Sequence, residues 1–233
     1  MEAVVLAGGL GTRLRPAVAD VPKPMAPVGG RPFLEHLLEY WIGEGVRRAV
    51  LAVGYKHDMI RRHFGSSFHG CDIAYAVEDR PLGTGGALLN SLPLLEGKGT
   101  CLLLNGDTYF AVRLRELESL HRARQAAVTL SLFRSLQGAR YTSVSLDAAS
   151  RVTALGGRTS GEMLVNGGAL LFQHETFRGI SRPKSGLLAL ENDLLATLLR
   201  DGRAIFGYTS TAPFVDIGVP EDWRAAERVI APN

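Results

Sequence analysis

The chain has little cysteine and no long hydrophobic run. Its 233 residues include two cysteines, Cys71 and Cys101, which are too few for a disulfide framework and lack the spacing of a metal site. We expect both to be small buried residues. No uninterrupted apolar segment approaches the roughly 20 residues of a membrane span, and the amino terminus lacks the regions of a signal peptide. The sequence therefore predicts a cytoplasmic protein without a membrane partner.

Clusters of basic residues interleaved with aromatic residues are also missing. The 26 lysines and arginines barely exceed the 23 acidic residues, which gives a net charge of +3. Such a balance suits small phosphate-bearing molecules better than nucleic acid, so we expect no nucleic acid partner. With 46% hydrophobic and 21% charged residues and no repeats, the composition is typical of a soluble globular domain.

A glycine-rich turn follows the first predicted strand directly. Residues 3–7 form a short apolar run typical of a buried parallel strand, and three glycines stand within residues 8–11. Glycine lets the backbone approach a ligand closely, and successive N–H groups in such a turn form an anion-binding nest. Arg13 and Arg15 follow and supply guanidinium groups for phosphate oxygens. The turn therefore predicts a phosphate-binding site.

This turn matches neither of the common phosphate-binding motifs. A dinucleotide fingerprint needs a glycine where Leu14 stands, and a P-loop needs Gly-Lys-Ser/Thr, which is absent. Lys23 stands between two prolines that fix the backbone on either side of it. A point charge on such a stiff tether suits a site that brings two phosphorylated substrates together. The alternative is a glycine-rich turn with solvated arginines.

A second glycine-rich turn begins with an acidic residue at a strand end. Glu78 follows the predicted strand 72–77, and residues 81–86 read PLGTGG before a predicted helix. This arrangement suits a shelf for a flat ring with a polar edge. An ionised carboxylate can accept hydrogen bonds from the N1–H and the amino group of guanine, a pair of donors that uracil and thymine do not offer. A helix-capping loop is the alternative.

Another carboxylate ends the predicted central strand, residues 100–104. Asp107 follows this strand at the edge where open α/β sheets bind their ligands. Mg²⁺ prefers oxygen ligands, usually one or two carboxylates together with phosphates and waters. Asp107 is therefore the first predicted metal ligand, and an Asx turn is the alternative.

The spacing of apolar residues predicts alternating helices and strands. The predicted helices span 32–44, 56–64, 114–124 and 187–199, with a last one from Pro220, and further strands span 46–53, 127–133, 163–172 and 203–208. Two short alternating stretches within 143–155 predict a hairpin, where the regular alternation ends. We expect an α/β fold, a Rossmann-like and mostly parallel sheet flanked by helices, with a small antiparallel sheet beside it.

Together these motifs resemble the signature of the sugar-1-phosphate nucleotidyltransferases. The resemblance rests on residues 6–16 (LAGGLGTRLRP), 22–25 (PKPM) and 30–32 (GRP), and it extends over nearly the whole chain. Members of that family join a nucleoside triphosphate to a sugar 1-phosphate and release pyrophosphate. The resemblance implies an enzyme with the nucleotide-diphospho-sugar transferase fold and a single domain over residues 1–233. Residues 1–135 would bind the nucleotide, and residues 136–233 would bind the sugar beneath the small antiparallel sheet.

The same resemblance implies a role for each motif. The implied catalytic residues are Arg13, Lys23 and Asp107, and the implied ligands of Mg²⁺ are Asp107 and Asp216. The implied nucleotide-binding residues are Leu6, Ala7, Gly8, Gly9, Gly11, Thr12, Arg13, Glu78, Pro81, Gly83 and Thr84. The implied sugar-phosphate-binding residues are Asn105, Arg158, Asn166, Gly167 and Glu191. Arg158 departs from the family pattern, because relatives usually carry a lysine that holds the sugar phosphate near this point.

Within the family, residues 78–86, 165–168 and 215–223 most resemble those of guanylyltransferases. We therefore expect the partners to be GTP and a sugar 1-phosphate, with D-glycero-α-D-manno-heptose 1-phosphate as the preferred acceptor. One alternative is uridylyl or thymidylyl transfer to a hexose or N-acetylmuramic acid 1-phosphate. An alternative of another class is an inactive regulatory subunit that binds a nucleotide sugar. The sequence carries no signal for an oligomeric state.

Overall fold

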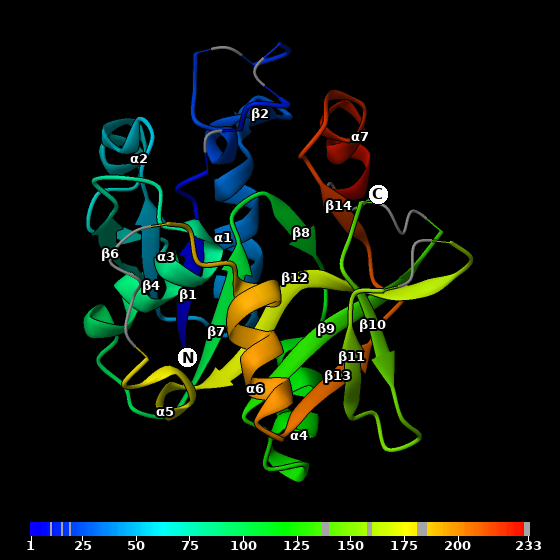
Figure 1. The fold of residues 1–233 in the computed structure, drawn as a ribbon. Helices are drawn as coiled ribbons and strands as arrows, with labels where there is room; N and C mark the ends of the chain where they lie inside the picture. Colours follow the sequence, from blue (N-terminus) through cyan, green and yellow to red (C-terminus); the bar gives the residue numbers. More distant parts are fainter. Residues whose placement is uncertain are drawn as a thin grey trace.

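A ten-stranded mixed sheet runs through the molecule, with helices on both of its faces (Figure 1). The computed structural model describes residues 1–9, 11–14, 16–18, 20–136, 140–157, 160–180 and 186–230. The strand order is β11–β10–β12–β7–β1–β4–β6–β5, with β9 paired to β12 and β13 paired to β9. The first strand, β1, therefore lies near the centre of the sheet.

The strands divide into a parallel block and a block that pairs around β12. The parallel block contains β7 (Thr100–Asn105), β1 (Glu2–Leu6), β4 (Arg48–Val53) and β6 (Cys71–Val77). The long strand β12 (Met163–Gln173) is antiparallel to β7, to β9 (Val128–Ser135) and to β10 (Ser143–Leu146). The remaining strands are β5 (Ser67–Phe68) and β11 (Val152–Leu155), which are antiparallel to their neighbours, and β13 (Ile205–Thr209), which is parallel to β9.

Two short antiparallel pairs and a set of helices complete the described fold. The pairs are β2 (Pro27–Val28) with β3 (Arg31–Pro32), and β8 (Thr108–Phe110) with β14 (Phe214–Asp216). The α-helices are α1 (Phe33–Glu44), α2 (His57–Phe64), α3 (Gly83–Ser91), α4 (Leu114–Ala123), α5 (His174–Phe177), α6 (Ala196–Arg200) and α7 (Pro220–Ile230). The 3₁₀-helices are η1 (Lys23–Met25) and η2 (Leu92–Leu94), and η3 (Leu190–Leu195) is a π-helix. None of the described helices is long and apolar enough to cross a bilayer.

The alternation of side chains in β1 places one hydrophobic core on each face of the sheet. Val4 belongs to a cluster with Leu88 of α3 and Leu195 of η3, whereas Val5 belongs to a cluster with Phe33 and Trp41 of α1. Successive residues of a strand point to opposite faces, so a strand covered on both sides is apolar throughout. This explains why β1 reads as a continuous apolar run.

The predicted fold class is confirmed, and the differences lie at particular elements. The hairpin within 143–155 forms as β10 and β11, but it pairs with β12 and so extends the central sheet instead of forming a separate one. The helix predicted over 187–199 begins at Leu190, because Ala189 is extended and the backbone of Leu188 is hydrogen-bonded to Leu82 and Gly85. The short strands β2, β3, β5 and β8 were not predicted. Cys71 and Cys101 are buried, as expected. The division into a nucleotide half and a sugar half stays a prediction.

A buried histidine joins α4 to the sheet. His121 is 1% exposed; its Nδ1 contacts the Thr129 hydroxyl at 2.9 Å, and its Nε2 contacts the Gln173 amide nitrogen at 2.9 Å. Because the amide nitrogen of Gln173 can only donate, Nε2 accepts, and the imidazole proton is on Nδ1. Burial lowers the pKa of His121 to about 4. The folded protein therefore holds this ring in its neutral form.

We expect the free energy of unfolding to fall as the pH is lowered from about 6.5 to about 4. In this window the unfolded chain binds a proton at His121 that the folded chain excludes, which lowers stability by up to about 3 kcal/mol. Urea unfolding at a series of pH values measures this slope. His121→Gln should flatten it, whereas the exposed His69→Asn should leave it close to that of the wild type. An unchanged slope in His121→Gln would show that other groups cause the pH dependence.

Candidate active site

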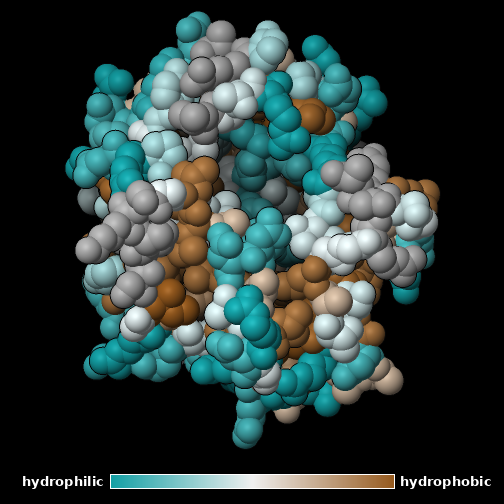
Figure 2. Space-filling model, viewed as in Figure 1, coloured by the Kyte–Doolittle hydropathy of each residue, from teal (hydrophilic) through white to brown (hydrophobic). Residues whose placement is uncertain are grey.

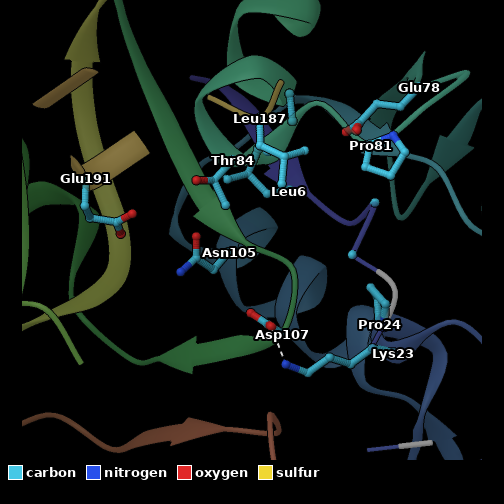
Figure 3. Close-up of a pocket in the computed structure, with 14 residues that line it drawn as sticks. Leu6, Lys23, Pro24, Glu78, Pro81, Thr84, Asn105, Asp107, Leu187 and Glu191 are labelled. Atoms are coloured by element: carbon cyan, nitrogen blue, oxygen red, sulfur yellow. Dashed lines mark hydrogen bonds and ion pairs between the residues drawn. The ribbon is translucent and has the colours of Figure 1, made fainter. Parts of the chain in front are cut away.

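A cavity of about 310 Å³ opens at the carboxyl ends of β1, β6 and β7. Figure 2 shows a hollow with a hydrophilic lining on this face. The residues that line the cavity come from segments far apart in the sequence: Leu6, Gly8, Gly9, Lys23, Pro24, Glu78, Pro81, Gly83, Thr84, Ala87, Asn105, Asp107, Leu187 and Glu191. In the close-up, Glu78 lies at one end, Glu191 at the opposite end, and Asp107 with Lys23 at a third side (Figure 3). The cavity therefore has three polar regions.

The floor of the cavity requires two strand ends to lie in close contact. The Gly106 N–H donates to the Leu6 carbonyl at 2.9 Å, and a Cβ on Gly106 would lie 2.6 Å from that carbonyl oxygen. No residue with a side chain fits there without a shift of the backbone. Gly106 thus keeps the ends of β1 and β7 together and places Asp107 beside the glycine-rich turn.

Glu78 occupies the first polar region. One carboxylate oxygen, Oε2, accepts a hydrogen bond from the Leu82 N–H at 3.1 Å. The other oxygen lies where a side chain on Gly8 would be, 2.9 Å from the position of its Cβ. Burial raises the pKa of Glu78 above its ordinary value, and the hydrogen bond from Leu82 partly opposes this rise. The structure thus brings Glu78 next to the first glycine-rich turn, and its role in binding the base stays a prediction.

The two predicted metal ligands come together through the pairing of β8 with β14. Thr108 pairs with Asp216 in this small sheet, and the Ile217 N–H donates to the Asp107 carbonyl at 3.0 Å. Residues more than a hundred positions apart in the chain are thereby fixed side by side. Sequence reasoning missed β8, and the only signal for it was the β-forming composition of Thr108-Tyr-Phe110.

A single cation contacts both carboxylates. The Lys23 ammonium group donates to Asp107 Oδ2 and lies 3.9 Å from Asp216 Oδ1, while the Gly218 N–H donates to the same Oδ1 at 2.7 Å. The Lys23 side chain is 10% exposed and that of Asp216 is 15% exposed. The position of the ammonium group shows that both carboxylates can reach one cation. The donor set is all oxygen, which fits Mg²⁺.

Two carboxylates are all that the described residues supply for this ion. Within that part of the chain, no group of three or more histidine, cysteine, aspartate or glutamate residues could hold a metal. A magnesium ion commonly takes its other ligands from substrate phosphates and water. The geometry therefore suits a metal that binds together with a phosphorylated ligand.

Arg140 forms the outer boundary of this charged group and was missed from the sequence. Its Nη2 donates to Asp216 Oδ2 and to the Asp216 carbonyl, each at 3.1 Å, and its Nη1 donates to Asp222 on α7. Acidic and basic side chains thus alternate from Asp107 to Asp222. No motif marks Arg140, because its partners lie 76 and 82 residues further along the chain.

The polar region at the end of the cavity opposite Glu78 contains Glu191, which is hydrogen-bonded to Asn166. The Asn166 amide donates to Glu191 Oε1 at 3.1 Å, and its own oxygen accepts from the Gly168 N–H at 3.2 Å. Asn105 lies next to Gly168 and lines the cavity. Amide and carboxylate groups on neighbouring elements suit the hydroxyl groups of a sugar.

Several predicted residues lie outside the cavity lining. Ala7 is buried beneath it, whereas Thr12 and Arg13 are exposed beside it, and the charge of Arg13 acts on the phenol of Tyr141. Gly11 packs against the Lys23 side chain. Gly167 faces the ring of Phe110, which leaves no room for a side chain there. The predicted phosphate contact Arg158 lies outside the described residues. Pro24, Ala87 and Leu187 line the cavity without having been predicted.

Comparison with known proteins extends these observations. The model of the family described as nucleotidyl transferase matches residues 2–231 of the chain. A D-glycero-α-D-manno-heptose 1-phosphate guanylyltransferase from Aneurinibacillus thermoaerophilus is 37% identical over 231 residues, which cover 98% of this chain and 97% of that protein. A protein of the same name from Campylobacter jejuni is 35% identical and covers 96% of this chain and 97% of its own length.

The fold is also similar to that of solved structures. The crystal structure of HddC from Yersinia pseudotuberculosis complexed with GMP-PN has a TM-score of 0.82 with this chain and is 29% identical to it. The match covers 97% of this chain and 98% of that protein. The similarity therefore extends over nearly the whole chain.

Proposed function

This chain belongs to the nucleotidyl transferase family, and we propose that it transfers GMP from GTP to D-glycero-α-D-manno-heptose 1-phosphate and releases pyrophosphate. The observation that carries the proposal is the three-part cavity. A buried carboxylate and glycine-rich shelf at one end suit a guanine, an amide and a carboxylate at the other suit a sugar, and a lysine with two aspartates lies between them. The relatives named for the same reaction support this assignment of donor and acceptor.

The reaction requires an in-line displacement at phosphorus. A phosphate oxygen of the sugar 1-phosphate forms a bond to the α-phosphorus of GTP, and the bond from that phosphorus to the bridging oxygen breaks, so pyrophosphate leaves with the electron pair. Positioning and stabilisation of charge dominate such transfers. In our proposal the N–H groups of residues 8–11 and the guanidinium of Arg13 hold the leaving phosphates. Lys23 neutralises the phosphates that approach each other.

Enzymes of this family generally use a divalent metal ion, and we propose Mg²⁺ held by Asp107 and Asp216. When bound there, the ion supplies positive charge to the phosphate oxygens as negative charge develops on them. Arg140 keeps one oxygen of Asp216 engaged, which directs the other toward Lys23 and Asp107. The carboxylates are thereby oriented before the substrates arrive.

A pyrophosphate-release assay tests the proposed substrates. The common nucleoside triphosphates are crossed with heptose, mannose, glucose and N-acetylmuramic acid 1-phosphates, and kcat/KM is measured for each pair. We expect the highest value for GTP with D-glycero-α-D-manno-heptose 1-phosphate. Mannose 1-phosphate is the matched acceptor, because it lacks one hydroxymethylene group outside the ring. A preference for a pyrimidine triphosphate would refute the guanylyl assignment, and no release with any pair would favour a regulatory subunit.

Loss of either proposed metal ligand should lower turnover. We expect Asp107→Asn and Asp216→Asn to reduce kcat by about a hundredfold or more, because each removes a charge that holds the cation. Asp222→Asn is the matched control, since Asp222 contacts Arg140 but not Lys23. It should keep most of its turnover. Thermal unfolding of each variant checks the fold, and unchanged turnover of both Asp107→Asn and Asp216→Asn at saturating Mg²⁺ would refute the metal assignment.

Glu78 should determine the choice of base. Each charge-assisted hydrogen bond contributes roughly 1.5–3 kcal/mol, so Glu78→Gln should lower kcat/KM for GTP about tenfold or more. It should change kcat/KM for UTP little, because uracil offers no matching pair of donors. The exposed neighbour Asp79→Asn is the matched control and should retain the preference for GTP.

The pH dependence gives a second readout for Glu78. Its raised pKa means that it takes up a proton at a higher pH than an ordinary glutamate. A protonated carboxyl loses the charge that guanine requires, so KM for GTP should rise as the pH is lowered, and this rise should be absent in Glu78→Gln. Equal pH profiles of the two proteins would contradict the assignment.

A further inference from the structure

The glycine-rich shelf beside Glu78 is packed against residues 188–190, about a hundred positions further along the chain. The N–H groups of Gly85 and Gly86 donate to the Leu188 carbonyl at 2.8 and 3.2 Å, and the Leu188 N–H donates to the Leu82 carbonyl at 2.9 Å. Gly83 has a φ of +78°, and a Cβ on it would lie 2.5 Å from the Leu188 oxygen. The glycines of this shelf therefore serve a contact between two chain segments.

Thr84 extends this contact to the start of the π-helix η3. Its hydroxyl oxygen accepts a hydrogen bond from the Leu190 N–H at 2.8 Å. Leu190 is the first residue of η3, and the first N–H groups of a helix have no partner within the helix itself. The preceding N–H, that of Ala189, donates to Asp193 Oδ2 at 2.6 Å. Thr84 thus caps η3 from a different helix, which fixes the direction in which η3 begins.

The residue directly after Leu190 is Glu191. Its Oε1 accepts from the Asn166 amide at 3.1 Å, and its side chain lines the cavity at the end opposite Glu78. In Figure 3, Thr84 lies between the two ends of the cavity. Thr84 is therefore connected to Glu191 by one hydrogen bond, to the Leu190 N–H, and by the peptide unit that joins Leu190 to Glu191. A second hydrogen bond connects Glu191 to Asn166.

We propose that Thr84 is a positioning residue for the acceptor sugar, which it serves by fixing the backbone that carries Glu191. Its place in the sequence suggests a nucleotide ligand, whereas the hydrogen bond that its hydroxyl oxygen accepts in the structure comes from Leu190. The proposal rests on the part of the proposed function in which Glu191 contacts the sugar. It also joins the base shelf and the sugar region into one hydrogen-bonded unit.

The test compares KM for the two substrates in variants of Thr84. Thr84→Val keeps the shape of the side chain but removes the hydrogen-bond acceptor. We expect KM for the sugar 1-phosphate to rise about tenfold, the effect of one hydrogen bond, while KM for GTP stays within about twofold. Thr84→Ser retains the hydroxyl group and should behave like the wild type. Ser91→Ala is the matched control, because the Ser91 hydroxyl donates within α3 to the Ala87 carbonyl and should affect neither KM.

A double-mutant cycle with Glu191→Gln separates the inference from the proposed function. Glu191→Gln alone should raise KM for the sugar 1-phosphate, and adding Thr84→Val to it should raise that KM little further. Additive effects, an unchanged sugar KM in Thr84→Val, or a larger change in KM for GTP would each overturn the inference while leaving the proposed function intact. An unchanged sugar KM in Glu191→Gln would refute the proposed contact of Glu191 with the sugar, and the inference with it. Thermal unfolding of Thr84→Val and Thr84→Ser establishes that both variants fold.

Discussion

The contact of Lys23 with two aspartates is the interaction on which the geometry of the site depends. Asp107 and Asp216 end strands from distant parts of the chain, and two carboxylates held this close repel each other unless a cation lies between them. Lys23 supplies that cation from η1, and Arg140 supplies a second one on the outer side of Asp216. The pairing of β8 with β14 holds the backbone in register, and the charges then fix the side chains. The same contacts that hold the two aspartates together also orient their oxygens toward one point, as the proposed metal site requires.

Much of this site could be predicted because its parts are local in the sequence. The glycine-rich turn after β1, the carboxylate after β6 and the Asn-Gly-Asp after β7 each follow a recognisable strand, and parallel strands bring such ends to one edge. The remaining features depend on long-range pairing. Arg140 meets Asp216 across 76 residues, and β8 meets β14 across more than a hundred, so neither leaves a pattern within any one window of sequence. The helix of residues 187–199 was predicted, but its start at Leu190 was not, because the Leu190 N–H is bonded by Thr84 from a distant part of the sequence.

The glycines illustrate why a correct motif does not by itself assign a role. The glycine-rich turns predict that the backbone lies close to another group, and a phosphate or a base of a ligand is a reasonable candidate for that group. In the structure, Gly106 admits the Leu6 carbonyl, Gly83 admits Leu188, and Gly167 admits the ring of Phe110. Gly8, by contrast, leaves its space to a polar side chain in the cavity, that of Glu78. A close contact between two segments of the same chain and a close contact with a ligand both require a residue without a side chain. Only the fold shows which of the two a given glycine makes.

The connection between the two ends of the cavity has a consequence for the chemistry. Phosphoryl transfer of this kind needs its two substrates in line, and an error of about 1 Å in their relative position is costly. If the base shelf and the sugar region belonged to separate rigid parts, their distance would change with every movement between those parts. Here α3 carries the shelf, and its hydrogen bonds to residues 188 and 190 hold the start of η3, which carries Glu191. Lys23 and Asp107 line a third side of the same cavity, and Asp216 lies 3.9 Å from the Lys23 ammonium group. Under the proposed function, direct contacts between the elements that bind donor and acceptor thus set the relative placement of the two substrates, and a reaction that depends on positioning requires this.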